Sequence, residues 1–184
     1  LPDGRLFVGS CTGEAFTLLQ LLPDGTLDAS FGRGGVAIYD DRRLAGTIST
    51  LALGPRGTIV AGGVVVLGAY EGGAVVRVAA DGTLDPSFGD GGIVALAPPH
   101  PSLVYDLVTD AEGAVVATLG GPFATLRLTP DGTPDVRYGA DGIVTTPVGD
   151  FSQSVTIGLA PDGGVLVGGT VVQGGTALFA LVRY

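Results

Sequence analysis

The sequence predicts an all-β fold, a β-propeller built of four-stranded antiparallel blades. Two sequence markers recur with one shared period of 50 to 57 residues, four short β-branched runs fall within each period, and glycine or proline bounds the runs. β-Branched residues favour strands, and four strands in a period near 50 residues are typical of a propeller blade. No run carries a helical apolar stripe long enough for a stable helix. We expect about three and a half to four blades, belonging to a larger ring or assembly.

The longer marker is a loop rich in aspartate and glycine. It spans residues 23–36, returns 57 positions later at residues 80–93, and returns more loosely after another 50 positions at residues 130–143. Its first aspartate can accept backbone N–H groups in an Asx-type turn. Its aromatic residue can fold back and fill the space between neighbouring sheets. The aromatic residues in question are Phe31, Phe88 and Tyr138.

The shorter marker is a glycine turn in front of an apolar run. Its glycines, Gly4, Gly57, Gly113 and Gly163, lie 53, 56 and 50 positions apart. A glycine supplies the positive φ that a tight hairpin needs between the first and second strands of a blade. We predict strands at residues 47–53, 58–66, 74–79 and 92–96 in the second period, and at 103–108, 114–119, 124–128 and 143–148 in the third.

The strand count over the whole chain is uneven. The chain opens within a predicted second strand, at residues 5–9, and stops within a predicted third strand, at residues 177–184. The approximate blades 1–46, 47–101, 102–150 and 151–184 therefore hold three, four, four and three strands. Because exposed strand edges and open end faces bind other strands, we expect further blades of the same chain, or copies in a homo-oligomer, as partners.

The repeated residues also resemble a known family. The pattern Asp-Gly-Thr-Leu-Asp-x-Ser-Phe-Gly-x-Gly-Gly at residues 81–92, with the Pro-Asp-Gly turns such as residues 161–163, resembles the delta-60 repeat family. Pro134 and Tyr138 depart from that pattern. The resemblance implies a propeller in a secreted or cell-surface bacterial protein, so the expected location is extracellular, periplasmic or at the cell surface. It implies no catalytic residues.

Composition excludes several classes of protein. The formal net charge is −9, with 18 acidic residues against 9 basic ones, so the chain lacks the basic stripe of a nucleic-acid binder. Its hydrophobic fraction of 46% is too high for a disordered chain. The longest apolar stretch, residues 58–70, is short and interrupted by glycine, so we expect no insertion into a membrane.

The sequence contains no recognisable catalytic set. Cys11 lies in a Gly-x-Cys-x-Gly run between two predicted antiparallel strands, where a nucleophile elbow has no function. His100 is the only histidine, which leaves little for a zinc site or a triad. We therefore predict no enzymatic activity. The alternative is a glycosidase-like enzyme that uses a pair among the non-repeating acids. These acids are Glu14, Asp40, Asp41, Glu71, Asp106 and Asp150.

No cofactor is expected. Asp81, Asp85 and Asp90 could offer oxygen ligands to calcium, but turn capping by the same side chains is the favoured interpretation. A second recurrent polar position, occupied by Gln20, Arg77, Arg127 and Arg183, lies in the third strand of each period. An arginine there can hold a marker aspartate.

The connections from second to third strand, and from fourth strand to the next first strand, share one face of a propeller. They differ most between the repeats, and variable loops on a rigid frame are where binding sites are found. The candidate binding residues there are Tyr39, Asp40, Asp41, Arg42, Arg43, Tyr105, Asp150 and Phe151. We expect a non-catalytic scaffold that binds protein or carbohydrate, with a carbohydrate-active enzyme or a structural subunit of a surface filament as alternatives.

Overall fold

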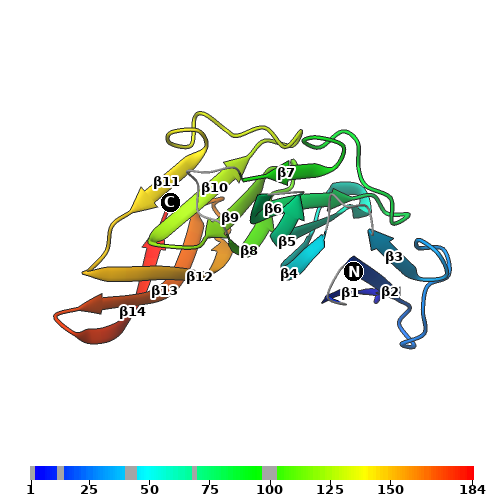
Figure 1. Ribbon diagram of the computed structural model, residues 1–184, viewed down its shortest axis with the longest axis horizontal. Helices are drawn as coiled ribbons and strands as arrows, with labels where there is room; N and C mark the ends of the chain where they lie inside the picture. Colours follow the sequence, from blue (N-terminus) through cyan, green and yellow to red (C-terminus); the bar gives the residue numbers. More distant parts are fainter. Residues whose placement is uncertain (1–2, 12–14, 40–44, 68–69, 97–102) are drawn as a thin grey trace.

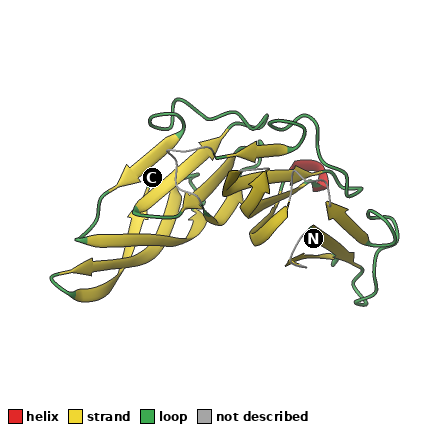
Figure 2. Ribbon diagram, in the orientation of Figure 1, coloured by secondary structure: helices red, strands yellow, loops and turns green. Residues whose placement is uncertain are grey.

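The computed structural model describes residues 3–11, 15–39, 45–67, 70–96 and 103–184. These residues form four antiparallel sheets of three, four, four and three strands, which confirms the predicted strand count. Figure 1 shows the sheets side by side along an arc, in the order of the chain. Figure 2 shows a short helical turn, η1 (Pro55–Gly57), among the strands and loops. Among the described residues, no helix has the length and apolarity to cross a bilayer.

Within each sheet the strands pair in sequence order. The first sheet contains β1 (Leu6–Cys11), β2 (Phe16–Leu21) and β3 (Val36–Tyr39). The second contains β4 (Ala45–Leu53), β5 (Ile59–Leu67), β6 (Tyr70–Val78) and β7 (Ile93–Ala95). The third contains β8 (Val104–Thr109), β9 (Val115–Leu119), β10 (Phe123–Leu128) and β11 (Ile143–Thr146). The fourth contains β12 (Phe151–Leu159), β13 (Val165–Gln173) and β14 (Thr176–Arg183).

The glycines of the shorter marker have the predicted conformation. Gly4, Gly57, Gly113 and Gly163 have φ angles of 84°, 78°, 92° and 84°. A side chain at this φ would be strained, so the turn requires glycine in every repeat.

The aromatic residue of each longer marker packs between neighbouring sheets, as predicted. Phe31 is fully buried with side chains of the first and second sheets, such as Phe16 and Ile59. Phe88 is buried in the same way against the third sheet, and Tyr138 packs against the fourth. These aromatic contacts fill the apolar core between consecutive sheets.

Hydrogen bonds within the marker loops confirm the predicted turn capping. The Asp24 carboxylate accepts the backbone N–H of Thr26 at 2.9 Å, and Asp81 accepts that of Thr83 at the same distance. In the second repeat the recurrent arginine also behaves as predicted, because Arg77 Nε lies 2.8 Å from Asp85 Oδ2. The marker loops are thus fixed by their own side chains.

The first strands of the second, third and fourth sheets carry a feature that the sequence analysis did not predict. The pairing register shifts between Ile48 and Thr50 in β4, between Val104 and Asp106 in β8, and between Ser154 and Thr156 in β12. Each shift leaves one extra residue in the first strand, as in a β-bulge, and bulges re-aim side chains. Because β8 contacts both β4 and β12, the bulged strands lie together along the inner side of the arc.

Candidate functional site

A shallow cavity of about 230 Å³ lies between the turn that joins β9 to β10 and the loop that joins β11 to β12. The first of these joins a second strand to a third strand, and the other joins a fourth strand to the next first strand. Both kinds of connection lie on the same face of a propeller, so the cavity lies on the face where the repeats differ most. Its lining comprises Gly121, Pro122, Pro147, Val148, Gly149, Asp150, Phe151 and Ser152. Two of the eight predicted binding residues, Asp150 and Phe151, therefore meet in one concave surface.

Asp150 and Phe151 present different chemistry to this cavity. Asp150 Oδ2 accepts the backbone N–H of Gly174 at 2.8 Å, which holds the carboxylate against the turn between β13 and β14. The Phe151 side chain is 62% exposed at the start of β12. The cavity thus combines a positioned hydrogen-bond acceptor with an exposed aromatic ring.

Tyr105 lies on the neighbouring first strand, at the extra residue of the β8 bulge. Its hydroxyl accepts a hydrogen bond from Gln153 Nε2 at 2.8 Å, so it joins β8 to β12. Gln153, two residues after Phe151, was not among the predicted binding residues. Its position near the loop end of a first strand, two residues before Val155, the bulge residue that corresponds to Tyr105, was the only available signal.

Tyr39 does not belong to this site, because the structure buries it. Its hydroxyl donates to the Gly82 carbonyl at 2.8 Å, and its ring packs edge-on against Phe16 with the centroids 5.7 Å apart. Burial raises the pKa of Tyr39, and the negative charge of Asp81 adds to the shift, so the hydroxyl stays neutral at physiological pH. Tyr39 is therefore a contact between repeats.

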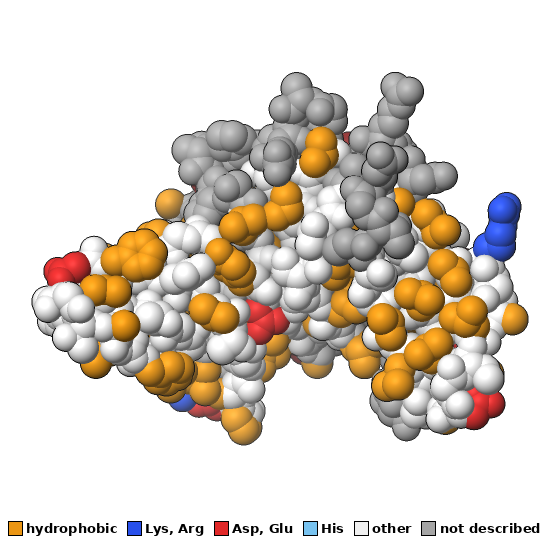
Figure 3. Space-filling view, turned by 60° about the horizontal axis from the view of Figure 1, so that its bottom comes forward, with side chains coloured by type: hydrophobic (Ala, Val, Ile, Leu, Met, Phe, Trp, Pro, Cys, Tyr) orange, Lys and Arg blue, Asp and Glu red, His pale blue; other side chains and the backbone are white. Residues whose placement is uncertain are grey.

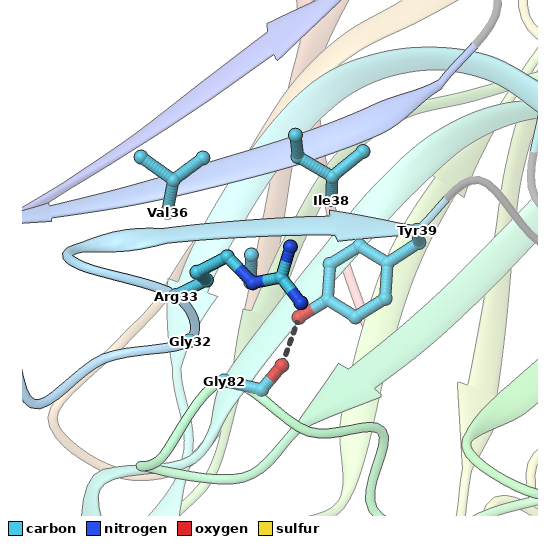
Figure 4. A pocket seen from close by; sticks show the side chains of 7 residues that line it. Gly32, Arg33, Val36, Ile38, Tyr39 and Gly82 are labelled. Carbon is cyan, nitrogen blue, oxygen red and sulfur yellow. Dashed lines mark hydrogen bonds between the residues drawn. The ribbon is translucent and has the colours of Figure 1, made fainter.

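Tyr39 also lines a larger cavity of about 450 Å³ beside β3, together with Arg33, Ile38 and Gly82. Figure 4 shows that its hydroxyl points to the Gly82 carbonyl, to which it is bonded. The hydroxyl proton of Tyr39 is therefore already used in a contact between repeats. The remaining predicted binding residues, Asp40, Asp41, Arg42 and Arg43, lie outside the described residues.

Asp106 was one of the acids considered for a glycosidase pair, and the structure gives it another role. Its Oδ1 accepts the Thr50 hydroxyl of β4 at 2.7 Å and the Leu107 N–H at 2.9 Å. Its Oδ2 accepts the Thr156 hydroxyl of β12 at 3.0 Å and the Ile157 N–H at 3.1 Å. A carboxylate with four donors from three sheets is a structural tie.

The carboxyl groups give no further support for general acid catalysis. A glycosidase needs one carboxyl with a raised pKa, whereas every aspartate of the described segments with a resolved pKa shift has a lowered pKa. These are Asp3, Asp24, Asp28, Asp81, Asp85, Asp131, Asp135 and Asp162. Within the same segments, no three acidic, histidine or cysteine side chains are arranged to hold a metal ion. His100 and the side chain of Cys11 lie outside the described part.

Comparison with protein families gives one match. Residues 1–31 and 57–88 match a family described as a domain of unknown function (DUF5122) beta-propeller. This supports the predicted resemblance at the level of a propeller repeat family of unknown function, but the delta-60 name stays a prediction. A search of curated proteins finds no match.

Comparison with solved structures shows the β-propeller fold. A gluconolactonase from Xanthomonas campestris is similar with a TM-score of 0.56 and 14% identity, over 100% of this chain and 55% of that one. Regucalcin, a calcium-binding protein from Agrobacterium tumefaciens, has a TM-score of 0.50 and 18% identity, over 94% and 52%. A luciferin-regenerating enzyme has a TM-score of 0.51 and 11% identity, over 91% and 51%. The chain spans about half the length of the solved structures that it matches.

These comparisons overturn one prediction. We expected the chain to have no enzymatic role, on the ground that a repeat propeller without a recognisable catalytic set is a scaffold. That expectation is wrong, because the structures with this fold include a gluconolactonase and a luciferin-regenerating enzyme. At these identities the likeness establishes the fold alone, and a fold by itself assigns no activity.

Proposed function

We propose that this chain is a β-propeller module that binds a carbohydrate or a closely related polyhydroxylated small molecule. The binding site is the cavity between the β9–β10 turn and the β11–β12 loop. The observation that carries the proposal is the pairing of an exposed aromatic ring, Phe151, with a positioned carboxylate, Asp150, in one concave surface.

The chemistry of a sugar ring fits these two groups. One face of a pyranose presents C–H groups, which pack on the negative face of an aromatic ring. Its rim presents hydroxyl groups, which donate hydrogen bonds to an ionised carboxylate. A volume of about 230 Å³ suits a single ring rather than an extended peptide segment, which favours carbohydrate over protein as the ligand.

The test is a titration of the chain with a panel of neutral hexoses, short oligosaccharides and glucono-1,5-lactone, followed by ligand-detected NMR or calorimetry. We expect a dissociation constant of about 1 mM for a fitting ring, because a small open site yields only about 4 kcal/mol. Phe151→Ala should weaken binding at least about tenfold through the lost ring contact. Asp150→Asn should weaken it as well, because it removes the charged acceptor.

Phe179→Ala is the matched control, since Phe179 is also an exposed phenylalanine, at 78%, but does not line the cavity. Equal losses for Phe151→Ala and Phe179→Ala, or no binding by any member of the panel, would contradict the proposal. The lactone is also assayed for hydrolysis, because a structure with this fold is a gluconolactonase. Turnover that Asp150→Asn removes would extend the function of this cavity from binding to catalysis.

The proposal includes the extracytoplasmic location that the delta-60 resemblance implies, since extracellular and periplasmic proteins meet free glycans. Fractionation of cells that produce the native protein tests this part separately. Recovery in the cytoplasm alone would refute the location without touching the binding site.

A further inference from the structure

The outer face of the fourth sheet, which points away from the third sheet, is apolar and exposed. Phe179 and Leu181 of β14 are 78% and 61% exposed, and Leu181 pairs with Gly168 of β13. A Cβ added to Gly168 would lie 3.6 Å from the Phe179 ring, so all three residues lie on one face. A Cβ added to the next residue, Gly169, would instead meet Phe123 of the third sheet. Figure 3 shows hydrophobic side chains at the surface over both ends of the molecule.

The repeat shows what covers the equivalent face elsewhere in the chain. Gly9 and Gly62 occupy the position of Gly168 in the first and second sheets, by their spacing from the marker glycines. A Cβ at Gly9 would lie 3.0 Å from Ile48 and 3.3 Å from Leu51. A Cβ at Gly62, the equivalent glycine of the second sheet, would lie 2.5 Å from Val104 and 2.8 Å from Leu107.

In both cases the covering residues come from the first strand of the following sheet. They are apolar, three positions apart, and they straddle the bulge of that strand. At Gly168 the nearest atoms belong to Thr156 and Phe179 of its own sheet. The fourth sheet therefore has the glycine that lies under a following first strand in the first and second sheets, whereas the third sheet has the buried Thr118 at this position. The described surroundings of Gly168 do not supply such a strand.

We infer that this face is the docking surface for the first strand of a further repeat unit of the same kind. That strand lays two apolar side chains, at positions i and i+3 around a bulge, onto Gly168 beside Phe179 and Leu181. The solved propellers are about twice as long as this chain, which covers 55% of the gluconolactonase. The shared fold therefore accommodates additional strands beyond those described in this chain.

A second copy of this chain fits the surface less well. Its first sheet starts with β1, which corresponds to a second strand, among the residues that the structure describes. Its three described first strands, β4, β8 and β12, already pack in the interior of the arc. The copy thus has no free first strand among its described residues to lay on Gly168.

The test extends the chain after Tyr184 with a second copy of residues 79–128. This segment supplies a fourth strand for the last sheet and then a first strand that carries the copied Val104 and Leu107. Accessibility is measured as the maleimide labelling rate of Leu181→Cys in a Cys11→Ser background. We expect labelling to slow at least about tenfold in the extended chain, because the docked strand excludes the reagent.

Two controls separate docking from nonspecific cover. In the first, the copied Val104 and Leu107 become aspartate, and labelling should stay fast. In the second, Gly168→Ala should cost the original chain little, because its Cβ would lie 3.2 Å from the methyl of the exposed Thr156, which needs to move only slightly. The same substitution should restore fast labelling in the extended chain. Gly62→Ala should destabilise even the original chain, because its Cβ would clash with Val104 and Leu107.

Three results would overturn the inference. Labelling of a folded extended chain could remain as fast as that of the original chain. The aspartate-bearing extension could protect the cysteine of the Leu181→Cys variant as well as the apolar one does. The original chain could form a dimer in which this position is protected at micromolar concentration, which would make a second copy the occupant.

Discussion

The interface between the first and second sheets and the interface between the second and third share one backbone plan but use different side chains. In both, a marker loop bonds the next marker loop through its backbone. Gly32 N donates to the Asp81 carbonyl, and Gly89 N donates to the Asp131 carbonyl, each at 2.8 Å. A buried phenylalanine, Phe31 or Phe88, fills each interface.

The side-chain ties that cross from one sheet to the next are charged in one interface and neutral in the other. Within its own repeat, each of these marker loops has an aspartate paired with an arginine, Asp28 with Arg5 and Asp85 with Arg77. Between the second and third sheets, Arg77 bonds Asp85, Ser87 and the Pro130 carbonyl, and its guanidinium lies 4.5 Å from the centroid of the Phe88 ring. Between the first and second sheets, the equivalent residue is Gln20, whose buried Oε1 has no hydrogen-bond partner. There the Tyr39 hydroxyl makes the tie. The contrast teaches that the loop-to-loop backbone bond defines the repeat and that the side-chain tie is exchangeable.

Acid should have the largest effect, and it should act first on the charged interface. Burial raises the pKa of Asp85, but the hydrogen bonds from Ser87 and the charge of Arg77 outweigh it, so its pKa lies below the ordinary value. A carboxyl with a lowered pKa in the folded state stabilises it above the unfolded pKa, and this stability is lost as pH falls through the folded value. The urea midpoint should therefore be flat from about pH 7 to 5 and fall below about pH 4.

Hydrogen exchange at acid pH tests which of the two interfaces loses its amide protection first. Protection should fall at the Ser87 and Gly89 amides before it falls at the amides of β3, since the tie by Tyr39 carries no charge. Simultaneous loss at both interfaces would show that the charged tie makes no separate contribution.

Replacement of the arginine should have the next largest effect. Arg77→Leu leaves Asp85 and the Pro130 carbonyl without their partner in a mostly buried setting, so we expect a loss of about 2–4 kcal/mol in the free energy of unfolding. The variant should also lose part of its acid dependence. Arg137→Leu is the control, because Arg137 is 84% exposed and its buried partner Asp135 keeps the bond to Arg127 at 3.3 Å, so its unfolding midpoint should change much less. Equal effects of the two substitutions would contradict the claim that the Arg77 tie stabilises the interface between the second and third sheets.

Loss of the neutral tie should be milder. Tyr39→Phe removes one hydroxyl and leaves the Gly82 carbonyl without that donor, at a cost of about 1 kcal/mol. Chemical denaturation measures the change, and Tyr105→Phe, at a half-buried tyrosine, should cost less. A loss as large as that of Arg77→Leu would mean that the neutral interface is the stronger one.

The smallest effect should be a gain. Gln20→Met replaces a buried amide, whose oxygen is unbonded, by an apolar side chain of similar length, so stability should rise by up to about 1 kcal/mol. A rise in the thermal midpoint would support this. A clear fall would mean that a hydrogen bond of the amide nitrogen stabilises the fold by more than the burial of the unbonded oxygen destabilises it.

The features that recur in every repeat could be predicted from the sequence. The contacts that occur in a single repeat could not. The strand number, the glycine turns and the marker phenylalanines follow from local patterns that occur several times. The sequence predicts Tyr39 as a binding residue because it lies at a variable connection, but its partner Gly82 is 43 positions away. No local pattern contains that contact.

The candidate cavity illustrates the same limit. Asp150 and Phe151 were predicted from the variability of their loop, but their meeting with Pro122 depends on how two sheets stand to each other. Asp106 could have been found, because Thr50, Asp106 and Thr156 stand 56 and 50 positions apart. The offsets match those of the marker glycines from Gly57 onward, so a comparison of equivalent positions would have aligned two threonines with one aspartate.

The carboxylate of Asp106 has a consequence for cooperativity. In a linear array each unit interacts with its immediate neighbours, so stability is a sum of unit and nearest-neighbour terms. Asp106, in the third unit, bonds both of its neighbours, β4 on one side and β12 on the other, through one carboxylate, so the second and fourth units share that group. Opening either unit leaves that charge without part of its donor set, which links the unfolding of units that do not adjoin and favours an all-or-none transition over stepwise fraying from the ends.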